Sequence, residues 1–284
     1  MIRIFSDSTC DLSKELVERY DIQILPLHIL LGEEEFLDGV NITPDEIYKW
    51  SDEHKTTPKT SAVAMEDVMN ATRPFLEQGD EIIAFSISDE MSTSGNVMRM
   101  AAKEMEAEDR FHVINSANLS TGIGLLVVEA ASMAKNGSPA DEIISRIEEL
   151  KPYVRASFVV DTLTYLYRGG RCSGLAALAG GALKLHPQIV VVDGAMKPAK
   201  KYRGSIMRAT LDYVKDMESA ILNARKDRVF ITHSGSDPKV IQEVYDYLDG
   251  FHYFDEICIT RAGGVVSSHC GSGTLGVLFI ENHE

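Results

Sequence analysis

The chain has 284 residues, of which 44% are hydrophobic and 25% charged, the balance of a globular protein long enough to enclose a sizeable core. Its 28 Lys and Arg residues against 43 Asp and Glu give a formal net charge of −15. This excess of acid disfavours nucleic acid and anionic membranes as partners, because both bind basic surfaces. No apolar run approaches the ~20 residues of a membrane-spanning helix, and the first residues lack the features of a signal peptide. We therefore predict a cytoplasmic protein without stable membrane insertion.

The sequence offers few groups for a metal or a nucleotide. Its cysteines lie far apart and form no CxxC pair, which disfavours a zinc site, and a chain of this size without a secretion signal does not suggest a disulfide framework. It has no HExxH pattern and no GxxxxGK[ST] loop. The GxGxxG match at residues 271–276 leaves no room for the helix and second strand of a dinucleotide-binding unit. We predict no metal and no cofactor.

The first half of the sequence alternates apolar strands with helices. We predict strands over residues 1–5, 22–31, 81–88 and 111–116, a small hairpin over 32–40 and a polar loop over 53–62. We predict helices over residues 12–20, 65–79, 96–106 and 118–137, and two more that start at Thr43 and Ser138. Asp11 is expected to cap the first helix. Thr43 and Glu46 should form a capping box around Pro44, and Gly137 should end its helix.

The second half mixes hairpin and helix patterns. We predict strands over residues 155–161, 228–235, 256–264 and 276–281, helices over 162–170, 174–184, 205–224 and 237–248, and a hairpin over 188–202 that turns at Asp193-Gly194. The prediction is an α/β protein of two tightly packed domains. Residues 1–151 should contain a mainly parallel, doubly wound sheet, and residues 152–284 should be α+β in character with a hairpin.

Hydroxyl groups cluster near the ends of predicted strands. They occur at residues 6–9, 60–61, 86–94 and 116–121. Ligands bind at the carboxyl ends of parallel strands, so we expect these loops to converge on one ligand. Ordinary helix capping is the alternative, but it accounts for only one hydroxyl per helix. Hydroxyls and helix N-termini bind anions, and the scarcity of Lys and Arg in these loops favours a single carboxylate over a phosphate-rich ligand.

Two other residues have both a structural and a functional interpretation. His269 precedes a glycine-rich stretch whose backbone N–H groups are able to approach a ligand, so it either lines a site or serves the fold. Arg171 follows Gly169 and Gly170 at a predicted helix end. It either balances the helix dipole or is available to an anion or a partner.

Six short segments together resemble the DegV family of fatty-acid-binding proteins. They are SDSTCDL at 6–12, PKTS at 58–61, ISDEMSTSG at 87–95, DTLTYLYRGGRCSG at 161–174, YRG at 202–204 and HCGSG at 269–273. They follow the family's order and span nearly the whole chain. The resemblance implies two α/β domains that enclose a long-chain fatty acid, such as palmitate or oleate, in a carrier without catalytic activity of its own.

The resemblance also implies roles for individual residues. The expected ligands of the fatty acid carboxylate, with their supporting groups, are Thr60, Ser92, His269, Ser61 and Ser94. Arg171 and Arg203 belong to the region of the head group and of the docking partner. That partner would be an ATP-dependent fatty acid kinase subunit, which supplies nucleotide and magnesium and phosphorylates the fatty acid.

The sequence departs from the family pattern next to two of these residues. Ala62 stands where the family has Gln, and Thr93 stands where it has Gly. Two other functions fit the same groups. Ser92 or Ser94 with His269 would serve a hydrolase or an acyltransferase, and the hydroxyl-rich loops would equally serve a sensor of a different carboxylate.

Overall fold

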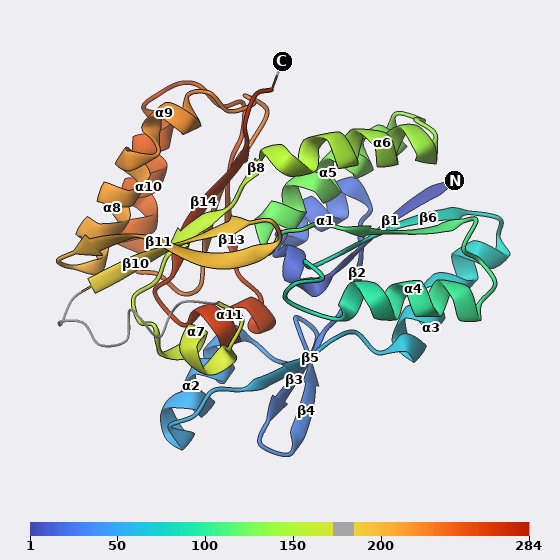
Figure 1. The fold of residues 1–284 in the computed structure, drawn as a ribbon, viewed down its shortest axis with the longest axis horizontal. Helices are drawn as coiled ribbons and strands as arrows, with labels where there is room; N and C mark the ends of the chain where they lie inside the picture. The colour runs from blue at the N-terminus through green and yellow to red at the C-terminus, as the bar shows by residue number, and fades with distance from the viewer. Residues whose placement is uncertain (173–184, 284) are drawn as a thin grey trace.

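The computed structural model describes residues 1–172 and 185–283, in which the strands form three sheets (Figure 1). The first sheet is parallel, with the order β2-β1-β6-β7. Its strands are β1 (Ile2–Asp7), β2 (Gln23–Leu25), β6 (Glu81–Ser86) and β7 (Phe111–Asn115). Helices α1 (Lys14–Tyr20), α5 (Thr121–Lys135) and α6 (Ala140–Leu150) cover one face, and α3 (Met65–Glu77) and α4 (Ser94–Glu104) cover the other. The predicted doubly wound parallel sheet is confirmed.

Strand β6 is apolar because both of its faces are buried. Ile83 and Phe85 belong to the core cluster that includes α5, whereas Ile82 and Ala84 belong to the cluster under α3 and α4. A strand that is covered by helices on both sides therefore has a continuous apolar sequence, which does not alternate with polar residues. The strand ends at the buried Ser86, where the chain turns towards α4.

Residues 28–61 form a second, antiparallel sheet, of which we predicted only a hairpin, placed over residues 32–40 where the structure has it over 28–37. Its strands are β3 (His28–Leu31), β4 (Glu34–Leu37) and β5 (Lys59–Ser61), and α2 (Pro44–His54) connects the last two. The prediction of one strand over 22–31 is wrong. The chain breaks after Leu25 because Pro26 lacks the N–H group that a continuing ladder needs, so β2 and β3 join different sheets. The predicted loop at 53–62 is also wrong at its end, since the polar strand β5 pairs with β3.

The third sheet lies in the left half of Figure 1 and has seven strands. They are β8 (Val154–Arg155), β9 (Ser157–Val159), β10 (Leu185–Val192), β11 (Ala195–Arg203), β12 (Val229–His233), β13 (Ile257–Arg261) and β14 (Leu275–Ile280). The order is β11-β10-β9-β14-β12-β13, with β8 paired to β14. The predicted hairpin is confirmed: Asp193 and Gly194 have φ of 53° and 75°, as a tight two-residue turn requires.

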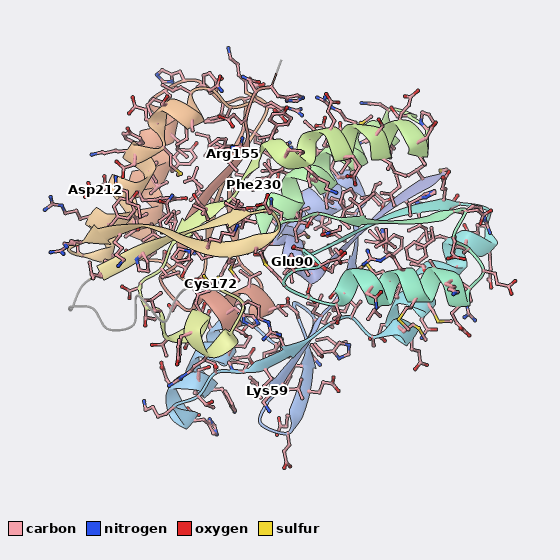
Figure 2. The ribbon with its side chains drawn as sticks, in the orientation of Figure 1. Lys59, Glu90, Arg155, Cys172, Asp212 and Phe230 are labelled. Carbon is pink, nitrogen blue, oxygen red and sulfur yellow. The ribbon has the colours of Figure 1, made fainter. Side chains whose placement is uncertain are left out.

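Helix α5 packs against both large sheets. One core cluster contains Phe85 of β6, Leu126 of α5, and Phe230 and Leu278 of the third sheet. Helices α8 (Ile206–Asp216), α9 (Glu218–Ile221) and α10 (Pro238–Asp249) cover the other face of the third sheet. Figure 2 shows Phe230 in the interior and Asp212 on the outer side of α8. Because α5 and both large sheets share one core, the packing does not divide the chain at residue 151. The domain boundary at that residue stays a prediction.

Two short helices complete the fold near the small sheet. They are α7 (Thr164–Gly169) and α11 (Gly264–Cys270), which pack against each other. We predicted α7 but missed α11, because Gly263 and Gly264 are poor helix formers and hide its start. The strand predicted over 256–264 accordingly ends at Arg261.

Two further predictions are wrong, and a third falls on residues that the structure does not describe. Asp11 does not cap α1, since the Ser13 side chain accepts the hydrogen bond from the Leu16 N–H group. The helix predicted over 205–224 is interrupted at Met217, which separates α8 from α9. The helix predicted over 174–184 lies outside the described residues. Within residues 1–172 and 185–283, each helix is too short or too polar to cross a membrane.

Candidate functional site

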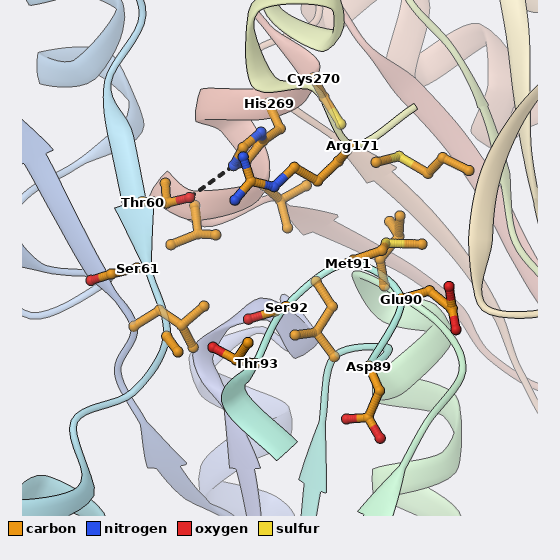
Figure 3. A pocket seen from close by; sticks show the side chains of 17 residues that line it. Thr60, Ser61, Asp89, Glu90, Met91, Ser92, Thr93, Arg171, His269 and Cys270 are labelled. Atoms are coloured by element: carbon orange, nitrogen blue, oxygen red, sulfur yellow. Dashed lines mark hydrogen bonds between the residues drawn. The ribbon is translucent and has the colours of Figure 1, made fainter. Parts of the chain in front are cut away.

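A cavity of about 440 Å³ lies beyond the carboxyl end of β6, between the parallel sheet, the small antiparallel sheet and α11 (Figure 3). Its apolar lining consists of Leu27, Ala62, Ile87, Met91, Leu119, Met196, Val265, Val266 and Cys270. Its polar lining consists of Thr60, Ser61, Asp89, Glu90, Ser92, Thr93, Arg171 and His269. This is the edge at which parallel sheets bind ligands. The polar groups lie on a largely apolar wall, so the cavity suits an amphipathic molecule.

Thr60 and His269 form a hydrogen-bonded pair across the pocket wall. The Thr60 Oγ1 atom lies 2.8 Å from Nε2 of His269, although the residues are 209 positions apart. Thr60 comes from the edge strand β5 and His269 from α11. Burial, with the nearby charge of Arg171, lowers the pKa of His269 to about 4. The imidazole is therefore neutral near pH 7.

The surroundings of the imidazole indicate which of its nitrogens carries the hydrogen. The Nδ1 atom of His269 is buried and has no hydrogen-bond partner among the described residues. A buried N–H group without an acceptor costs more than a buried lone pair, so the hydrogen belongs on Nε2. Nε2 then donates to Oγ1 of Thr60, and the Thr60 hydroxyl hydrogen is left for another acceptor.

Ser92 is held by Ser94 in a comparable way. The Ser94 backbone N–H group donates to the Ser92 Oγ atom at 3.2 Å, and the two hydroxyl oxygens are 3.0 Å apart. Ser94 is fully buried and does not line the cavity, so it lies behind Ser92. It is able to donate to Ser92 from both its N–H group and its hydroxyl, which leaves the Ser92 hydrogen for a ligand.

The other residues that we predicted for the site lie in different places. Ser61 is exposed at the rim, and Figure 3 shows its hydroxyl directed away from His269, as expected for the neighbour of Thr60 in a strand. Arg171 is exposed and lines the same side of the pocket as His269, with its Nη1 atom donating to the Gly169 carbonyl at 2.7 Å. Arg203 ends β11 and does not line the cavity.

The start of α4 shapes the rim below Ser92. A Cβ atom on Gly95 would lie 2.5 Å from Oδ1 of Asp89 and 2.6 Å from the Ser86 hydroxyl oxygen. Asp89 is also paired with Arg99 at 2.9 Å. Glycine at position 95 thus allows the preceding loop to fold closely over the first turn of α4, where free backbone N–H groups favour an anion.

The acidic rim and most of the apolar lining of the cavity were not predicted from the sequence. Asp89 and Glu90 were visible in the hydroxyl-rich loop, but we assigned them no place at the pocket. Leu27 and Met196 carried no signal, because they reach the cavity from a segment after β2 and from β11. Only the tertiary fold brings such distant apolar residues together.

Comparison with known proteins gives the chain a family. The DegV family model, described as "Uncharacterised protein, DegV family", matches residues 1–282. A DegV domain-containing protein of Caldanaerobacter subterraneus is 30% identical over 282 residues, with 99% of each chain covered. The solved DegV family protein of Thermus thermophilus, described by its fatty acid binding, has 28% identity and a TM-score of 0.90, with 99% of each chain covered.

A second solved structure agrees with the first. The stearic acid-binding protein of Eubacterium ventriosum has 29% identity and a TM-score of 0.86, covering 99% of this chain and 98% of that one. The family model and the full-length relative both span the parallel sheet, the small sheet and the third sheet. The chain therefore belongs to the DegV family, and its structural neighbours in that family include proteins that bind fatty acids.

Proposed function

We propose that the protein binds a long-chain fatty acid, with its carboxylate at Thr60 and Ser92 and its acyl chain among the apolar side chains of the cavity. The observation that carries this proposal is the pair of contacts behind these two hydroxyls: Nε2 of His269 lies 2.8 Å from Oγ1 of Thr60, and the Ser94 N–H group donates to Oγ of Ser92 at 3.2 Å. With the hydrogen of His269 on Nε2, these contacts orient both hydroxyls towards the ligand. His269 donates to Thr60, and Ser94 donates to Ser92, so that each hydroxyl has its own hydrogen left for the ligand. An ionised carboxylate only accepts hydrogen bonds, and it therefore matches a pair of donors.

The apolar wall would supply most of the affinity. Burying one methylene contributes about 0.8 kcal/mol, so about 14 methylenes contribute on the order of 11 kcal/mol before the cost of ordering the chain. Each hydrogen bond to the carboxylate adds about 1.5–3 kcal/mol. A smaller apolar cavity of about 20 Å³ lies beyond Leu119, Val266 and Cys270, and Phe158 and Leu278 line it. It supports a path for the acyl chain towards the third sheet.

We also propose that the bound fatty acid lies between the two predicted domains. Thr60 and Ser92 come from residues 1–151, and His269 and Arg171 come from residues 152–284. A ligand that contacts all four side chains would touch both parts of the chain, and it would stabilise their association by binding only the folded form.

The protein is proposed to act as a carrier that presents the fatty acid to an ATP-dependent fatty acid kinase subunit. The family resemblance motivates this partner. The exposure of Arg171 at the pocket and of Arg203 at the end of β11 supports it, because both cations are accessible on a chain of net charge −15. An acidic surface on the kinase would complement them.

A serine hydrolase or acyltransferase fits the geometry less well. In a catalytic triad a carboxylate orients the histidine through its second ring nitrogen. Here Nδ1 of His269 has no partner in the described part of the chain, and Nε2 contacts Thr60. A fluorophosphonate probe tests this alternative directly: a covalent adduct on Ser92 or Ser94 would favour the enzyme.

Native mass spectrometry of the purified protein is the test of the proposed function. We expect an additional mass of a few hundred daltons, lost on denaturation and recovered by solvent extraction as a fatty acid. Protein that is free of lipid and that also fails to take up palmitate or oleate would contradict the proposal. Uptake of a different carboxylate instead would favour the sensor.

A further inference from the structure

Two buried carboxyl groups hold the amino end of α11. The Oδ1 atom of Asp11 accepts a hydrogen bond from the Gly263 N–H group at 2.7 Å, and Oδ1 of Asp38 accepts one from the Gly264 N–H group at 2.6 Å. Both side chains are nearly inaccessible, with Asp11 at 5% and Asp38 at 2% relative exposure. We call Asp11 and Asp38 the aspartate clamp.

The Oδ2 atom of each carboxyl group contacts the hydroxyl of a serine, either near the start of the chain or just before α5. The Ser8 hydroxyl donates to Oδ2 of Asp38 at 2.8 Å. The Oδ2 atom of Asp11 lies 2.5 Å from the hydroxyl of Ser120, a buried residue before α5 whose φ of 54° a β-carbon disfavours. The clamp therefore connects α11 to two segments that lie more than a hundred residues away from it in the sequence.

Glycines at the start of α11 make this contact possible. A Cβ atom on Gly264 would lie 2.6 Å from Cδ1 of Ile29 and 3.0 Å from Oδ1 of Asp38. A Cβ on Gly263 would lie 3.2 Å from Oδ1 of Asp38 and 3.3 Å from Oδ1 of Asp11. Gly263 and Gly264, which hid the start of α11 in the sequence, therefore let the aspartate clamp approach the backbone of α11.

The opposite end of the same helix belongs to the pocket. Val265, Val266, His269 and Cys270 line the cavity, and His269 contacts Thr60. An isolated helix of this length does not hold itself in place, and its first N–H groups have no intrahelical partner. The position of the imidazole therefore depends on the contacts that hold α11: its packing against α7 and α2, and the hydrogen bonds at its amino end.

We propose that Asp11 and Asp38 are positioning residues of the binding site: by fixing the amino end of α11 they hold His269 against Thr60. This inference rests on the proposed function for its effect on the ligand, but its structural part concerns the lipid-free protein as well. Because hydroxyls both donate and accept, Ser8 and Ser120 allow the contacts with α11 to persist whether or not the carboxyl groups carry a proton. An asparagine, which keeps one carbonyl oxygen, should therefore replace each aspartate in this role.

The test compares Asp11→Ala and Asp38→Ala with Asp11→Asn, Asp38→Asn and the control Asp80→Ala in the full-length protein. Asp80 is also a buried acid, but it pairs with the terminal amine and Arg3 at the start of β6, far from the pocket. The first readout is the imidazole nitrogen signals and the pKa of His269 in lipid-free protein by NMR. The second is the affinity for cis-parinaric acid, a fluorescent fatty acid.

We expect the two clamp alanine variants to move the His269 signals, to raise its pKa towards 6.5, and to weaken cis-parinaric acid binding roughly tenfold. The asparagine variants should restore both readouts, and Asp80→Ala should lower stability only. His269 signals and affinity that stay unchanged in both clamp alanine variants would overturn the inference. If the wild type binds no fatty acid while the His269 signals still move, the proposed function fails and the positioning role stands.

A measurement on the wild type covers the case in which an alanine variant does not fold. The Gly263 and Gly264 amides lie at a helix end, and the hydrogen bonds that the described residues give them are those to Asp11 and Asp38. We expect their hydrogen exchange to be slowed at least a hundredfold relative to an unprotected amide. Exchange at the unprotected rate would overturn the positioning role.

Discussion

Gly169 lies directly against the imidazole of His269. A Cβ atom at position 169 would stand 2.3 Å from Nδ1 of His269, well inside any permissible contact. The neighbouring Gly170 serves the backbone, because its φ of 65° ends α7 in the left-handed conformation, and a Cβ there would meet nothing within 4 Å. In the sequence RGGR, Gly169 thus leaves space for the His269 ring, and Gly170 allows the backbone turn that ends α7.

The first prediction uses this pair. Gly169→Ala should displace His269 from Thr60 and weaken fatty acid affinity by roughly tenfold or more, because a Cβ atom and the imidazole cannot both occupy the present space and the ring has the cavity to move into. Gly170→Ala is the matched control. It should cost about 1–2 kcal/mol of stability through its left-handed backbone and leave affinity unchanged. Isothermal titration and thermal unfolding measure both, and equal affinities in the two variants would refute the assignment.

The second prediction concerns the head-group hydroxyls. Thr60→Ala and Ser92→Ala should each lower fatty acid affinity by about 10- to 100-fold, the value of one hydrogen bond to a charged group. Ser61→Ala is the control, because its exposed hydroxyl points away from His269. Binding is measured by fluorescence displacement. A double variant that retains lipid as tightly as the wild type would show that the carboxylate lies elsewhere.

The third prediction is that the free energy of unfolding falls as the pH rises from 6.5 to 8. Burial raises the pKa of Asp11 from 3.8 to about 8 and that of Asp7 to about 6. Such groups bind their proton more tightly when folded, so their stabilisation is present at low pH and is lost as the pH rises through the folded pKa. The pKa of His269 is lowered from 6.5 to about 4. This group therefore makes the free energy of unfolding rise with pH, but only below pH 6.5. Of these three groups, only Asp11 titrates between pH 6.5 and 8.

Denaturant unfolding at several pH values measures this slope. Asp11→Asn should flatten the decline in the free energy of unfolding over that window, because the amide does not titrate. Glu46→Gln should not flatten it, since hydrogen bonds from Thr43, which does not titrate, lower the pKa of Glu46 and it titrates at more acidic pH. A wild type whose stability is constant over the window would contradict the shift assigned to Asp11.

The fourth prediction addresses the partner. Arg171→Ala together with Arg203→Ala should reduce phosphorylation of fatty acid by the kinase subunit at least tenfold, measured at a fatty acid concentration that saturates each variant because Arg171 also lines the pocket. Lys239→Ala, on the exposed first turn of α10, is the control for the loss of one exposed cation, to be compared with each arginine variant singly. Acyl phosphate formation with purified kinase provides the readout, and full activity of the double variant would remove both arginines from the docking surface.

Local patterns in the sequence determined much of the fold. Apolar runs such as residues 81–85 identified strands buried on both faces, the capping box at Thr43 formed as expected, and Asp193-Gly194 set its hairpin. The polar loop before α4 also pointed to the pocket. These features depend on residues close together in the chain, so backbone propensities and periodicity reveal them.

The tertiary structure decided the rest, because the remaining features depend on distant residues. The polar strand β5 exists only through its pairing with β3, and α11 is held by two carboxyl groups from the first forty residues. Thr60 meets His269 across 209 positions of sequence. The sequence by itself determined which residue types the site contains, and long-range packing determined which of them meet and in which direction their hydrogens point.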